Sequence, residues 1–523
     1  MAGCPAADTW PAHIRKGTCH DATHAESAPA EPRRQLLAAG ATIAGGIVLS
    51  GCAKTPDSSA TGQADIDTVE AARPHTGRTV TTTLTAEPAI LDLGGTRAST
   101  LAYGTDLPGP LIRADVGDEL AITLVNRLTH PTSLHCHGIA LRNDMDGATP
   151  ATPNVEPGDN FTYRFSVPHP GTYWAHPHTG LDADRGLYLP LIVDDPDEPG
   201  DYDAEWIVVL DDWTDGIGKT PEQIWRDLSG SGSGAHDDMP GMGAMPTMEG
   251  VGTSTLLGGD AGDVNYPYYL INGRIPSAPT VFTAKPGQRI RLRIINAGSD
   301  TAFRVALAGH SMTVTHTDGY PVVPADVDAV LLGMGERYDA IITAGDGVFA
   351  LVAMPEGKNG VARALLSTGA GAGPDAGYQP PEMAGRVGTA AMFAATEAAS
   401  FPAGASDTSL TAELTGSMMT YDWSINGVTF PNAQPMTVQQ GQRVSLTFRN
   451  STTMWHPMHL HGHTFQIVRP DGSLGARKDT AIVLPKQTVS TTFIADNPGM
   501  WMMHCHNTYH QEAGMMTSVD YTT

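Results

Sequence analysis

The sequence predicts an all-β protein of three β-sandwich domains, and an internal repeat is the main reason. Gly117–Asn126, Gly287–Asn296 and Gly441–Asn450 each open with glycine, alternate apolar residues and close on asparagine. Alternation with a period of two after a glycine turn is typical of a β-strand. The distance along the chain between copies suits one β-sandwich domain per copy.

Composition agrees with this fold class. The 523 residues include 58 glycines and 39 prolines, as expected for many short strands joined by turns. A helical period is rare, and we expect one short helix near 220–228. The net charge of −25 argues against a nucleic-acid partner. We place the three domains at 76–197, 198–370 and 405–523, with a linker rich in glycine, alanine and proline at 371–404.

The N-terminal residues 1–52 have the pattern of an export segment. Arg33 and Arg34 precede an apolar run of small residues, which resembles a twin-arginine signal. The run ends in Leu-Ser-Gly-Cys at Cys52, which resembles a bacterial lipoprotein box. A transmembrane anchor is the alternative, although the run is short for one. We expect an exported protein of the cell envelope, periplasmic or held on the outer side of the cytoplasmic membrane by its lipid alone, and a disordered tether over 53–75.

Eight histidines form four His-X-His pairs, two in the first domain and two in the third. They are His135 and His137, His176 and His178, His459 and His461, and His504 and His506. Alternate residues of a strand face the same side, so each pair directs two imidazoles one way. Such a set is typical of a metal site.

The second domain serves as an internal control for these pairs. Aligned on the Gly-His pair that follows the repeat, with a one-residue shift relative to the closing asparagine, it has Ala306 and Ala308 in place of His459 and His461. It has Val352 and Met354 in place of His504 and His506. The fold element therefore needs no histidine, and the second domain is expected to bind no metal. His463 of the third domain has a counterpart in the second domain, His310. Because this histidine recurs in a copy without the pairs, both residues are interpreted as structural.

Cys505 lies between His504 and His506 and is followed by His510 and Met515. With His456 these residues offer a thiolate, two imidazoles and a thioether, the ligands of a blue-copper site. The positions equivalent to Cys505 are Pro177 and Ala353, so a second site of this kind is not expected. Of the five cysteines, three lie in the expected export segment 1–52 and this one binds metal, so only Cys136 remains and no disulfide framework is available.

These motifs resemble the multicopper oxidases, a family of laccases, cuprous oxidases and their relatives, over roughly residues 80–523. The resemblance implies three cupredoxin-like Greek-key domains and four copper ions, one of type 1, one of type 2 and two of type 3. It assigns His456, Cys505, His510 and axial Met515 to type 1. It assigns His135 and His459 to type 2. The type 3 pair takes the remaining paired histidines, which are His137, His176, His178, His461, His504 and His506.

Asp146, in a Met-Asp-Gly sequence after the first pair, resembles an acid that the family keeps near the cluster for proton delivery. A turn-forming Asp-Gly is the alternative. Family members often have tryptophan where this chain has Cys136, which we interpret as a small buried residue that faces away from the pair.

The substrate is suggested by methionines. Residues 236–249 contain four, spaced three apart among glycine and proline, and soft thioethers select Cu(I). We expect a monomeric oxidase that converts Cu(I) to Cu(II) for copper tolerance, with dioxygen as the acceptor. A low-complexity loop without function is the alternative for the segment. For the protein, the alternatives are a laccase-like phenol oxidase or ferroxidase that uses small reductants, and a copper-buffering protein without activity.

Overall fold

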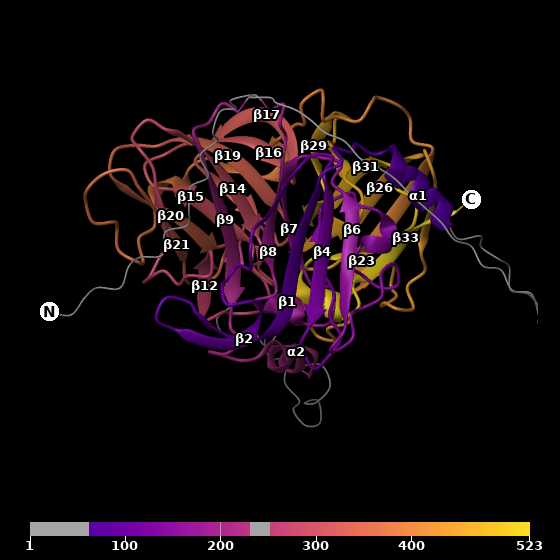
Figure 1. Ribbon diagram of the computed structural model, residues 1–523, viewed down its shortest axis with the longest axis horizontal. Coiled ribbons are helices and arrows are strands. Elements are labelled where there is room, and N and C mark those ends of the chain that lie inside the picture. Colours follow the sequence, from indigo (N-terminus) through magenta and orange to yellow (C-terminus); the bar gives the residue numbers. More distant parts are fainter. Residues whose placement is uncertain (1–61, 199, 231–251, 523) are drawn as a thin grey trace, which may run out of the picture.

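The computed structural model describes residues 62–198, 200–230 and 252–522. In these residues strands dominate and form three pairs of sheets, so the all-β prediction is confirmed (Figure 1). We call the pairs the first, second and third sandwich in chain order. The predicted export segment 1–52 and the methionine-rich segment 236–249 lie outside the described residues.

The first sandwich joins two four-stranded sheets, ordered β2-β1-β4-β6 and β3-β8-β7-β5. Its strands are β1 Thr79–Asp92, β2 Arg97–Tyr103, β3 Ile112–Asp115, β4 Glu119–Asn126, β5 His135–His137, β6 Asn160–Ser166, β7 Gly171–His176 and β8 Leu189–Asp194.

The second sandwich joins two six-stranded sheets, ordered β12-β9-β14-β19-β16-β17 and β13-β21-β20-β15-β18-β22. Its strands are β9 Ala204–Trp213, β12 Tyr268–Ile271, β13 Val281–Thr283, β14 Arg289–Asn296, β15 Phe303–Leu307, β16 Met312–Thr317, β17 Tyr320–Val327, β18 Ala329–Leu332, β19 Arg337–Thr343, β20 Val348–Pro355, β21 Ala362–Ser367 and β22 Val387–Gly388. A short ribbon pairs β10 Thr253–Ser254 with β11 Gly259–Asp260.

The third sandwich joins a six-stranded sheet, β24-β23-β26-β31-β28-β29, to a five-stranded one, β25-β33-β32-β27-β30. Its strands are β23 Thr408–Thr415, β24 Ser424–Ile425, β25 Met436–Gln439, β26 Arg443–Asn450, β27 His456–Leu460, β28 Phe465–Val468, β29 Leu474–Lys478, β30 Thr480–Val483, β31 Thr488–Ile494, β32 Met500–Cys505 and β33 Met516–Thr522.

The three copies of the sequence repeat form equivalent strands, β4, β14 and β26. Each runs parallel to the first strand of its sandwich and antiparallel to a later one. The glycines that open the repeats, Gly117, Gly287 and Gly441, have φ values of 84°, 81° and 85°. This left-handed conformation suits glycine because it has no Cβ, which explains why the glycine recurs.

The closing asparagine of each repeat is a buried hydrogen-bonding hub. The Nδ2 group of Asn450 donates to the carbonyl oxygens of Met454 and Val483, and its Oδ1 accepts from the Thr452 amide. Asn126 and Asn296 make the same set of bonds in their own sandwiches. An amide side chain satisfies backbone donors and acceptors that the strand leaves unpaired as it ends.

The prediction of a disordered tether over 53–75 is corrected for its described residues, 62–75. The expected tether 53–75 contains a helix, α1 Gln63–Ala72, and Glu70 Oε1 accepts a hydrogen bond from the Ser166 amide of β6 (Figure 1). The expected linker 371–404 contributes β22, which pairs with β18. Local composition suggests disorder over 53–75, but contacts with the sandwiches order the part that the structure describes.

The remaining elements are short. The helix predicted near 220–228 is confirmed as α2 Pro221–Gly230. The others are α3 Thr508–Glu512 and the single 3₁₀ turns η1 Asn143–Met145, η2 Asp182–Asp184, η3 Pro381–Ala384 and η4 Ala390–Met392. No helix within residues 62–198, 200–230 and 252–522 has the length and apolarity needed to cross a membrane.

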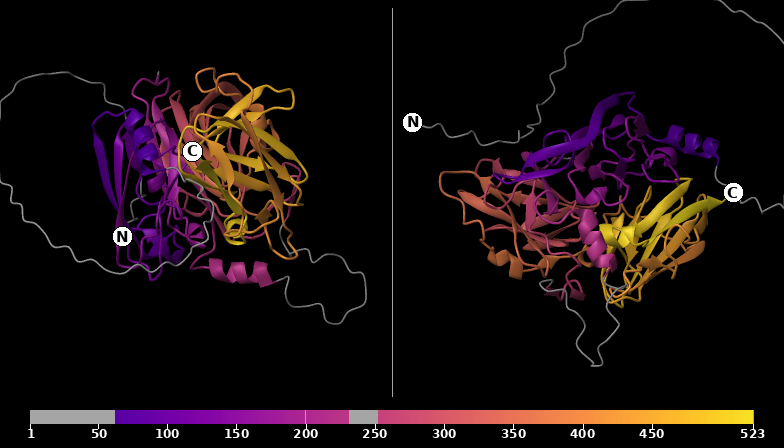
Figure 2. Two further views of the ribbon diagram at one scale, coloured as in Figure 1. Left: turned by 90° about the vertical axis from the view of Figure 1, so that its right-hand side faces the viewer. Right: turned by 90° about the horizontal axis from the view of Figure 1, so that it is seen from below.

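The three sandwiches lie around a common centre (Figure 2). Seen from below, the first sandwich contacts both others, and α2 lies at the boundary between the second and third. Side-chain contacts agree, since Asn143 of the first sandwich bonds Met500 of the third, and Thr172 of the first bonds Asp339 of the second. Residues far apart in sequence therefore meet at these boundaries.

Candidate metal centres

Strand pairing positions the paired histidines. In the first sandwich β5 pairs with β7 so that His135 is opposite His176. In the third sandwich β27 pairs with β32 so that His459 is opposite His504.

The second sandwich has the same pairing without the histidines. Its β15 and β20 place Ala306 opposite Val352, and Val305 opposite Ala353. In the third sandwich Met458 is opposite Cys505, the register that corresponds to Val305 and Ala353. The alignment made from the sequence repeat is therefore confirmed.

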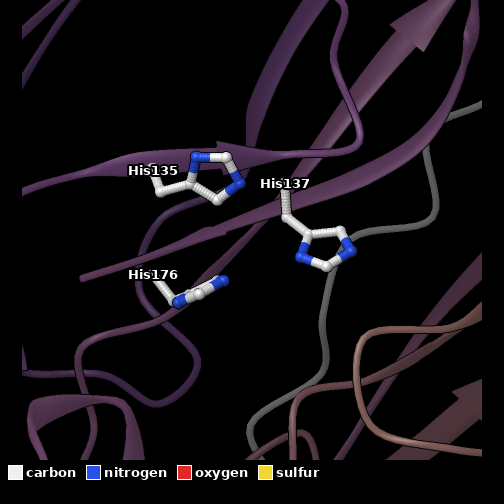
Figure 3. Close-up of side chains that lie close together, drawn as sticks. All are labelled: His135, His137 and His176. Atoms are coloured by element: carbon white, nitrogen blue, oxygen red, sulfur yellow. The ribbon is translucent and has the colours of Figure 1, made fainter. Parts of the chain in front are cut away.

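The eight paired histidines meet between the first and third sandwiches. The rings of His135 and His461 stack with centroids 3.8 Å apart, as do those of His137 and His459. Figure 3 shows how His135, His137 and His176 converge from β5 and β7. Ring nitrogens approach closely in three groups of three, each within 4.8 Å, which are His135, His137 and His176; His135, His459 and His461; and His178, His461 and His504.

His506 completes the cluster. Its Nε2 lies 3.2 Å from Nδ1 of His137, while Nε2 of His504 lies 3.0 Å from Nε2 of His461 and 3.3 Å from that of His178. Two imidazole nitrogens at such distances leave room for one shared proton or for a metal ion between them. The Nε2 atoms of His135, His176 and His459 are buried and have no protein partner. Unpartnered nitrogens of this kind suit metal ligands.

The protonation of these rings favours metal binding as well. Burial, together with repulsion between neighbouring imidazoles, lowers the pKa of His176, His178, His461, His504 and His506 well below the usual range. Neutral imidazole is the form that binds a metal.

The nitrogens that face away from the cluster are held by protein oxygens. His135, His176, His459 and His504 donate from Nδ1 to the carbonyl oxygens of Asp146, Pro177, Asp479 and Cys505. Such outer hydrogen bonds fix the tautomer and the ring orientation of a metal ligand.

Asp146 lies directly against this cluster and is fully buried. Its Oδ2 accepts a hydrogen bond from Nδ1 of His461 at 2.9 Å, and its carbonyl oxygen accepts from His135 at 2.8 Å. Its Oδ1 also lies 3.3 Å from Nδ1 of His135, so the carboxylate contacts histidines of both sandwiches. Gly147 follows with φ of 79°, and a Cβ there would overlap the Leu134 backbone.

Cys505, His456 and His510 form a separate group in the third sandwich. The Cys505 Sγ lies 3.7 Å from Nδ1 of His456 and 3.5 Å from Nδ1 of His510, and these two nitrogens are 3.1 Å apart. Ligands bonded at about 2.0–2.3 Å to one ion in trigonal geometry are separated by roughly 3.5–3.8 Å. The group is thus close to the shape that one copper ion requires.

The backbone around Cys505 places the other residues of this group. His510 lies on α3, where Asn507 caps the helix by accepting from the Tyr509 and His510 amides. The Cys505 amide donates to the Met515 carbonyl, and the Met515 amide donates to that of His510. Met515 is completely buried. Cys136, the other described cysteine, belongs to the apolar core, where burial raises the pKa of its thiol to about 12.

Three residues next to the metal groups were missed by sequence reasoning, because no motif surrounds them. Asp263 accepts from Nε2 of His510 at 3.0 Å. Burial lowers the pKa of His510, but Asp263 and the Cys505 sulfur raise it to about 10. Asp479 accepts from Nε2 of His137 at 3.1 Å, and Arg337 forms an ion pair with Asp479 at 2.7 Å.

His310 and His463 belong to none of the metal groups among the described residues. His310 bonds the Ala308 carbonyl and the Gly345 amide. His463 bonds the His461 carbonyl and the Tyr521 hydroxyl. Both ring nitrogens of each are used within the protein, which supports their structural interpretation.

The comparisons with known proteins agree with this geometry. Profiles of the multicopper oxidase family match residues 85–198, 204–371 and 405–523. The chain is 61% identical to multicopper oxidase MmcO of Mycobacterium tuberculosis, over 94% of this chain and 96% of that one. It is 28% identical to copper resistance protein A of Escherichia coli, over 83% and 91% of the two chains.

Among solved structures, the laccase from Botrytis aclada superposes with a TM-score of 0.70 at 26% identity, covering 90% of this chain and 93% of that one. Fold, histidine geometry and sequence similarity lead to one conclusion: the chain belongs to the multicopper oxidase family, oxidoreductases that use copper, dioxygen and a reducing substrate.

Proposed function

We propose that this multicopper oxidase oxidises Cu(I) to Cu(II) and couples four such one-electron steps to the reduction of dioxygen to water. The observation that carries the coupling is the position of Cys505. Its sulfur belongs to the mononuclear group, and its peptide neighbours His504 and His506 belong to the cluster. A thiolate ligand is thus separated from two cluster ligands by a few covalent bonds.

We assign the ligands by this geometry and by the family resemblance. His456, Cys505 and His510 would hold type 1 copper, together with Met515. His135 and His459 bind type 2. The type 3 pair is bound by His137, His176, His178, His461, His504 and His506. Bound copper, four ions in all, supplies the one-electron redox chemistry.

Side chains of the protein hold the ligands, line a pocket for the substrate and deliver protons. Asp263 holds His510 by a hydrogen bond and lines a pocket of about 610 Å³ beside the type 1 group. This hydrogen bond connects a wall of the pocket directly to a residue that would hold type 1 copper. Asp146 is positioned to pass protons to the cluster, since it contacts His461 and dioxygen reduction consumes protons.

Soft sulfur ligands support Cu(I) as the substrate. Residues 236–249 contain four methionines, and thioethers select Cu(I) over harder cations. In the described part of the chain, the Met419 side chain is 66% exposed, two residues from Tyr421. The Tyr421 ring lies 6.1 Å from that of His510. The similarity to copper resistance protein A points the same way.

A laccase-like phenol oxidase is the second candidate function. Ferroxidase activity and copper buffering without activity are the remaining alternatives. The pocket favours the phenol, since Ile224, Leu228 and Val264 line it together with Tyr266. An aromatic ring fits such apolar walls, and the resemblance to a laccase agrees. We propose that the protein is a monomer and that it lies in the cell envelope, anchored by a lipid at Cys52. Its three domains are proposed at 76–197, 198–370 and 405–523.

Oxygen uptake by the copper-loaded protein tests the proposal. We compare Cu(I) with a phenol as the reductant, for the wild type and for a variant that lacks residues 236–249. Cu(I) is expected to be the faster substrate, and the deletion is expected to slow Cu(I) turnover while phenol turnover stays unchanged. Faster phenol turnover contradicts the substrate assignment, and bound copper without oxygen uptake identifies a buffer.

A further inference from the structure

We infer that Arg337, from the second sandwich, is a positioning residue for the metal cluster that the first and third sandwiches form. It acts through Asp479, which determines the nitrogen that His137 turns toward the cluster. The inference rests on the ligand assignment proposed above. It gives the second sandwich, whose described residues contain none of the paired histidines, a direct part in the site.

His137 is oriented differently from its partners. Five cluster histidines donate from Nδ1 to a protein oxygen outside the cluster, namely His135, His176, His459, His461 and His504. His137 instead donates from Nε2 to Asp479, and its Nδ1 faces Nε2 of His506 at 3.2 Å. The ring is thus reversed, and the Asp479 carboxylate is its outer partner.

Asp479 holds more than one ligand. Its Oδ1 also lies 3.5 Å from Nδ1 of His459, and its carbonyl oxygen accepts from that same nitrogen. Thr480 donates its hydroxyl to Oδ1 as well. One fully buried carboxylate therefore serves a histidine of the first sandwich and one of the third.

Arg337 fixes the plane of this carboxylate. Its Nη1 and Nη2 atoms each lie 2.7 Å from one oxygen of Asp479. Its Nε donates to the Thr172 carbonyl at 3.0 Å, and Nη1 also donates to that of Gly335. With both oxygens engaged, the carboxylate cannot rotate away from His137. A planar fork of this kind is specific to arginine, because a lysine ammonium is a single point donor.

The second sandwich approaches the cluster so closely that two positions at this contact have no room for a Cβ atom, and both are glycines. Gly138 follows His137 with φ of 86°, and a Cβ there would overlap Nη2 of Arg337 and Oδ2 of Asp479. Gly335 has φ of 84°, and its Cβ would lie 2.9 Å from Cδ2 of His506 and 3.0 Å from Cε1 of His137. The turn before β19 therefore packs directly on two cluster rings.

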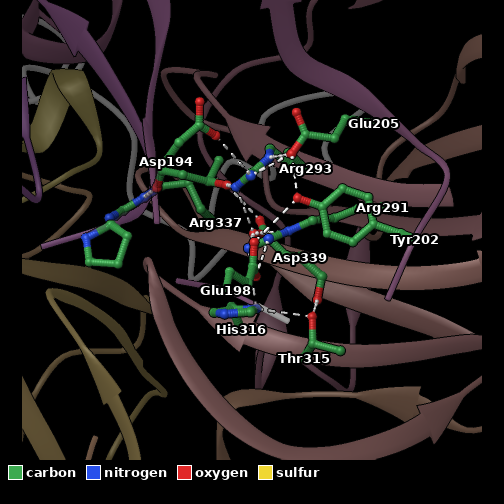
Figure 4. A network of polar contacts seen from close by, with 12 residues as sticks. Asp194, Glu198, Tyr202, Glu205, Arg291, Arg293, Thr315, His316, Arg337 and Asp339 are labelled. Carbon is green, nitrogen blue, oxygen red and sulfur yellow. Dashed lines mark hydrogen bonds and ion pairs between the residues drawn. The ribbon is translucent and has the colours of Figure 1, made fainter. Parts of the chain in front are cut away.

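Arg293 offers a matched control. It lies on β14, which pairs with β19, and its guanidinium is as deeply buried as that of Arg337. Figure 4 shows both side chains in one polar network. Arg293 pairs with Glu205 at 2.6 Å and with Asp339 at 3.2 Å, and neither of these acids bonds a cluster histidine in the described structure.

The test compares Arg337→Lys with Arg293→Lys in the full, copper-loaded chain. We measure the copper kept against a competing chelator, the paramagnetic resonance spectrum of the cluster copper, the blue absorbance and Tm. Both variants are expected to lower Tm. Arg337→Lys alone should weaken retention of cluster copper by roughly tenfold and change its resonance spectrum, with the blue absorbance intact. The inference is overturned if the two variants keep cluster copper equally well.

A second variant covers the case in which Arg337→Lys does not fold. Asp479→Asn removes the charge that Arg337 binds and keeps an oxygen for His137. It should give the same change in the resonance spectrum, and an unchanged spectrum contradicts the inference. The wild-type measurement distinguishes a failure of this inference from a failure of the proposed function. If the wild type itself shows no cluster copper, the ligand assignment fails rather than the role of Arg337.

Discussion

The His510 ring donates a hydrogen bond from Nε2 to Oδ2 of Asp263, 3.0 Å away, although 247 residues separate the two. The same carboxylate oxygen accepts a hydrogen bond from the Tyr421 hydroxyl at 2.6 Å. His510 uses its other nitrogen, Nδ1, toward Cys505 and His456. A proposed type 1 ligand is thus held from outside by an acid that also lines the neighbouring pocket.

We predict that Asp263→Asn raises the reduction potential of the type 1 site and, because the pocket loses a carboxylate that attracts a cation, slows Cu(I) oxidation about tenfold. The negative charge beside His510 stabilises the oxidised ion, and a hydrogen bond to a charged group contributes about 1.5–3 kcal/mol. A redox titration of the blue absorbance measures the first effect and oxygen uptake the second. Asp227→Asn is the control, because Asp227 lines the same pocket and pairs with Lys219. Equal potentials in both variants would refute the prediction.

The two described cysteines give a second pair of variants. Cys505→Ser should abolish the blue absorbance and oxygen uptake, because a serine hydroxyl does not replace a thiolate as a soft ligand. Cys136→Ser should keep both, since Cys136 packs in the apolar core. Its expected cost is a loss of stability from a hydroxyl buried there. Absorbance spectra and copper analysis decide the matter, and a blue Cys505→Ser protein would exclude the type 1 assignment.

We expect Asp146→Asn to reduce the rate of dioxygen reduction by about 10²–10⁴-fold, the usual contribution of a positioned proton donor. The amide keeps the size of the side chain and an oxygen near His461, so the cluster copper should remain. Rapid reoxidation of the fully reduced protein measures this step apart from substrate oxidation. Asp144→Asn, two residues away and paired with Arg142, should leave the rate unchanged. A normal rate in Asp146→Asn leaves the carboxylate with an orienting role only.

A pH-dependent gain in stability is predicted for Asp260→Asn. Burial raises the pKa of Asp260 from 3.8 to about 6. The folded state therefore binds this proton more tightly than the unfolded state does, and its contribution is full below pH 3.8 and lost as the pH rises through 6. At neutral pH the charged form costs at most about 3 kcal/mol. Thermal unfolding should show a higher Tm for the variant than for the wild type at pH 7.5, with no difference near pH 3.5. A Tm difference that is independent of pH contradicts this cause.

Features set by neighbouring residues were predictable from the chain. The repeat predicted β4, β14 and β26, because a glycine turn, an alternating strand and a closing asparagine are local patterns with local hydrogen bonds. The helix α2 was predictable for a similar reason. By contrast α1 was predicted as part of a disordered tether and β22 as part of a linker, since their order comes from contacts such as that of Glu70 with Ser166, 96 residues away.

The sequence by itself determined the family, the sandwich fold and the set of histidines and cysteine offered to copper. Spacing along a strand fixes which side chains point the same way, so a His-X-His pair is visible without a structure. Only the tertiary structure decided which groups hold those ligands from outside. Asp263, Asp479 and Arg337 come from other strands or other sandwiches, and packing between the sandwiches brings them within hydrogen-bonding distance. Such contacts depend on three-dimensional proximity and produce no periodic pattern in the sequence.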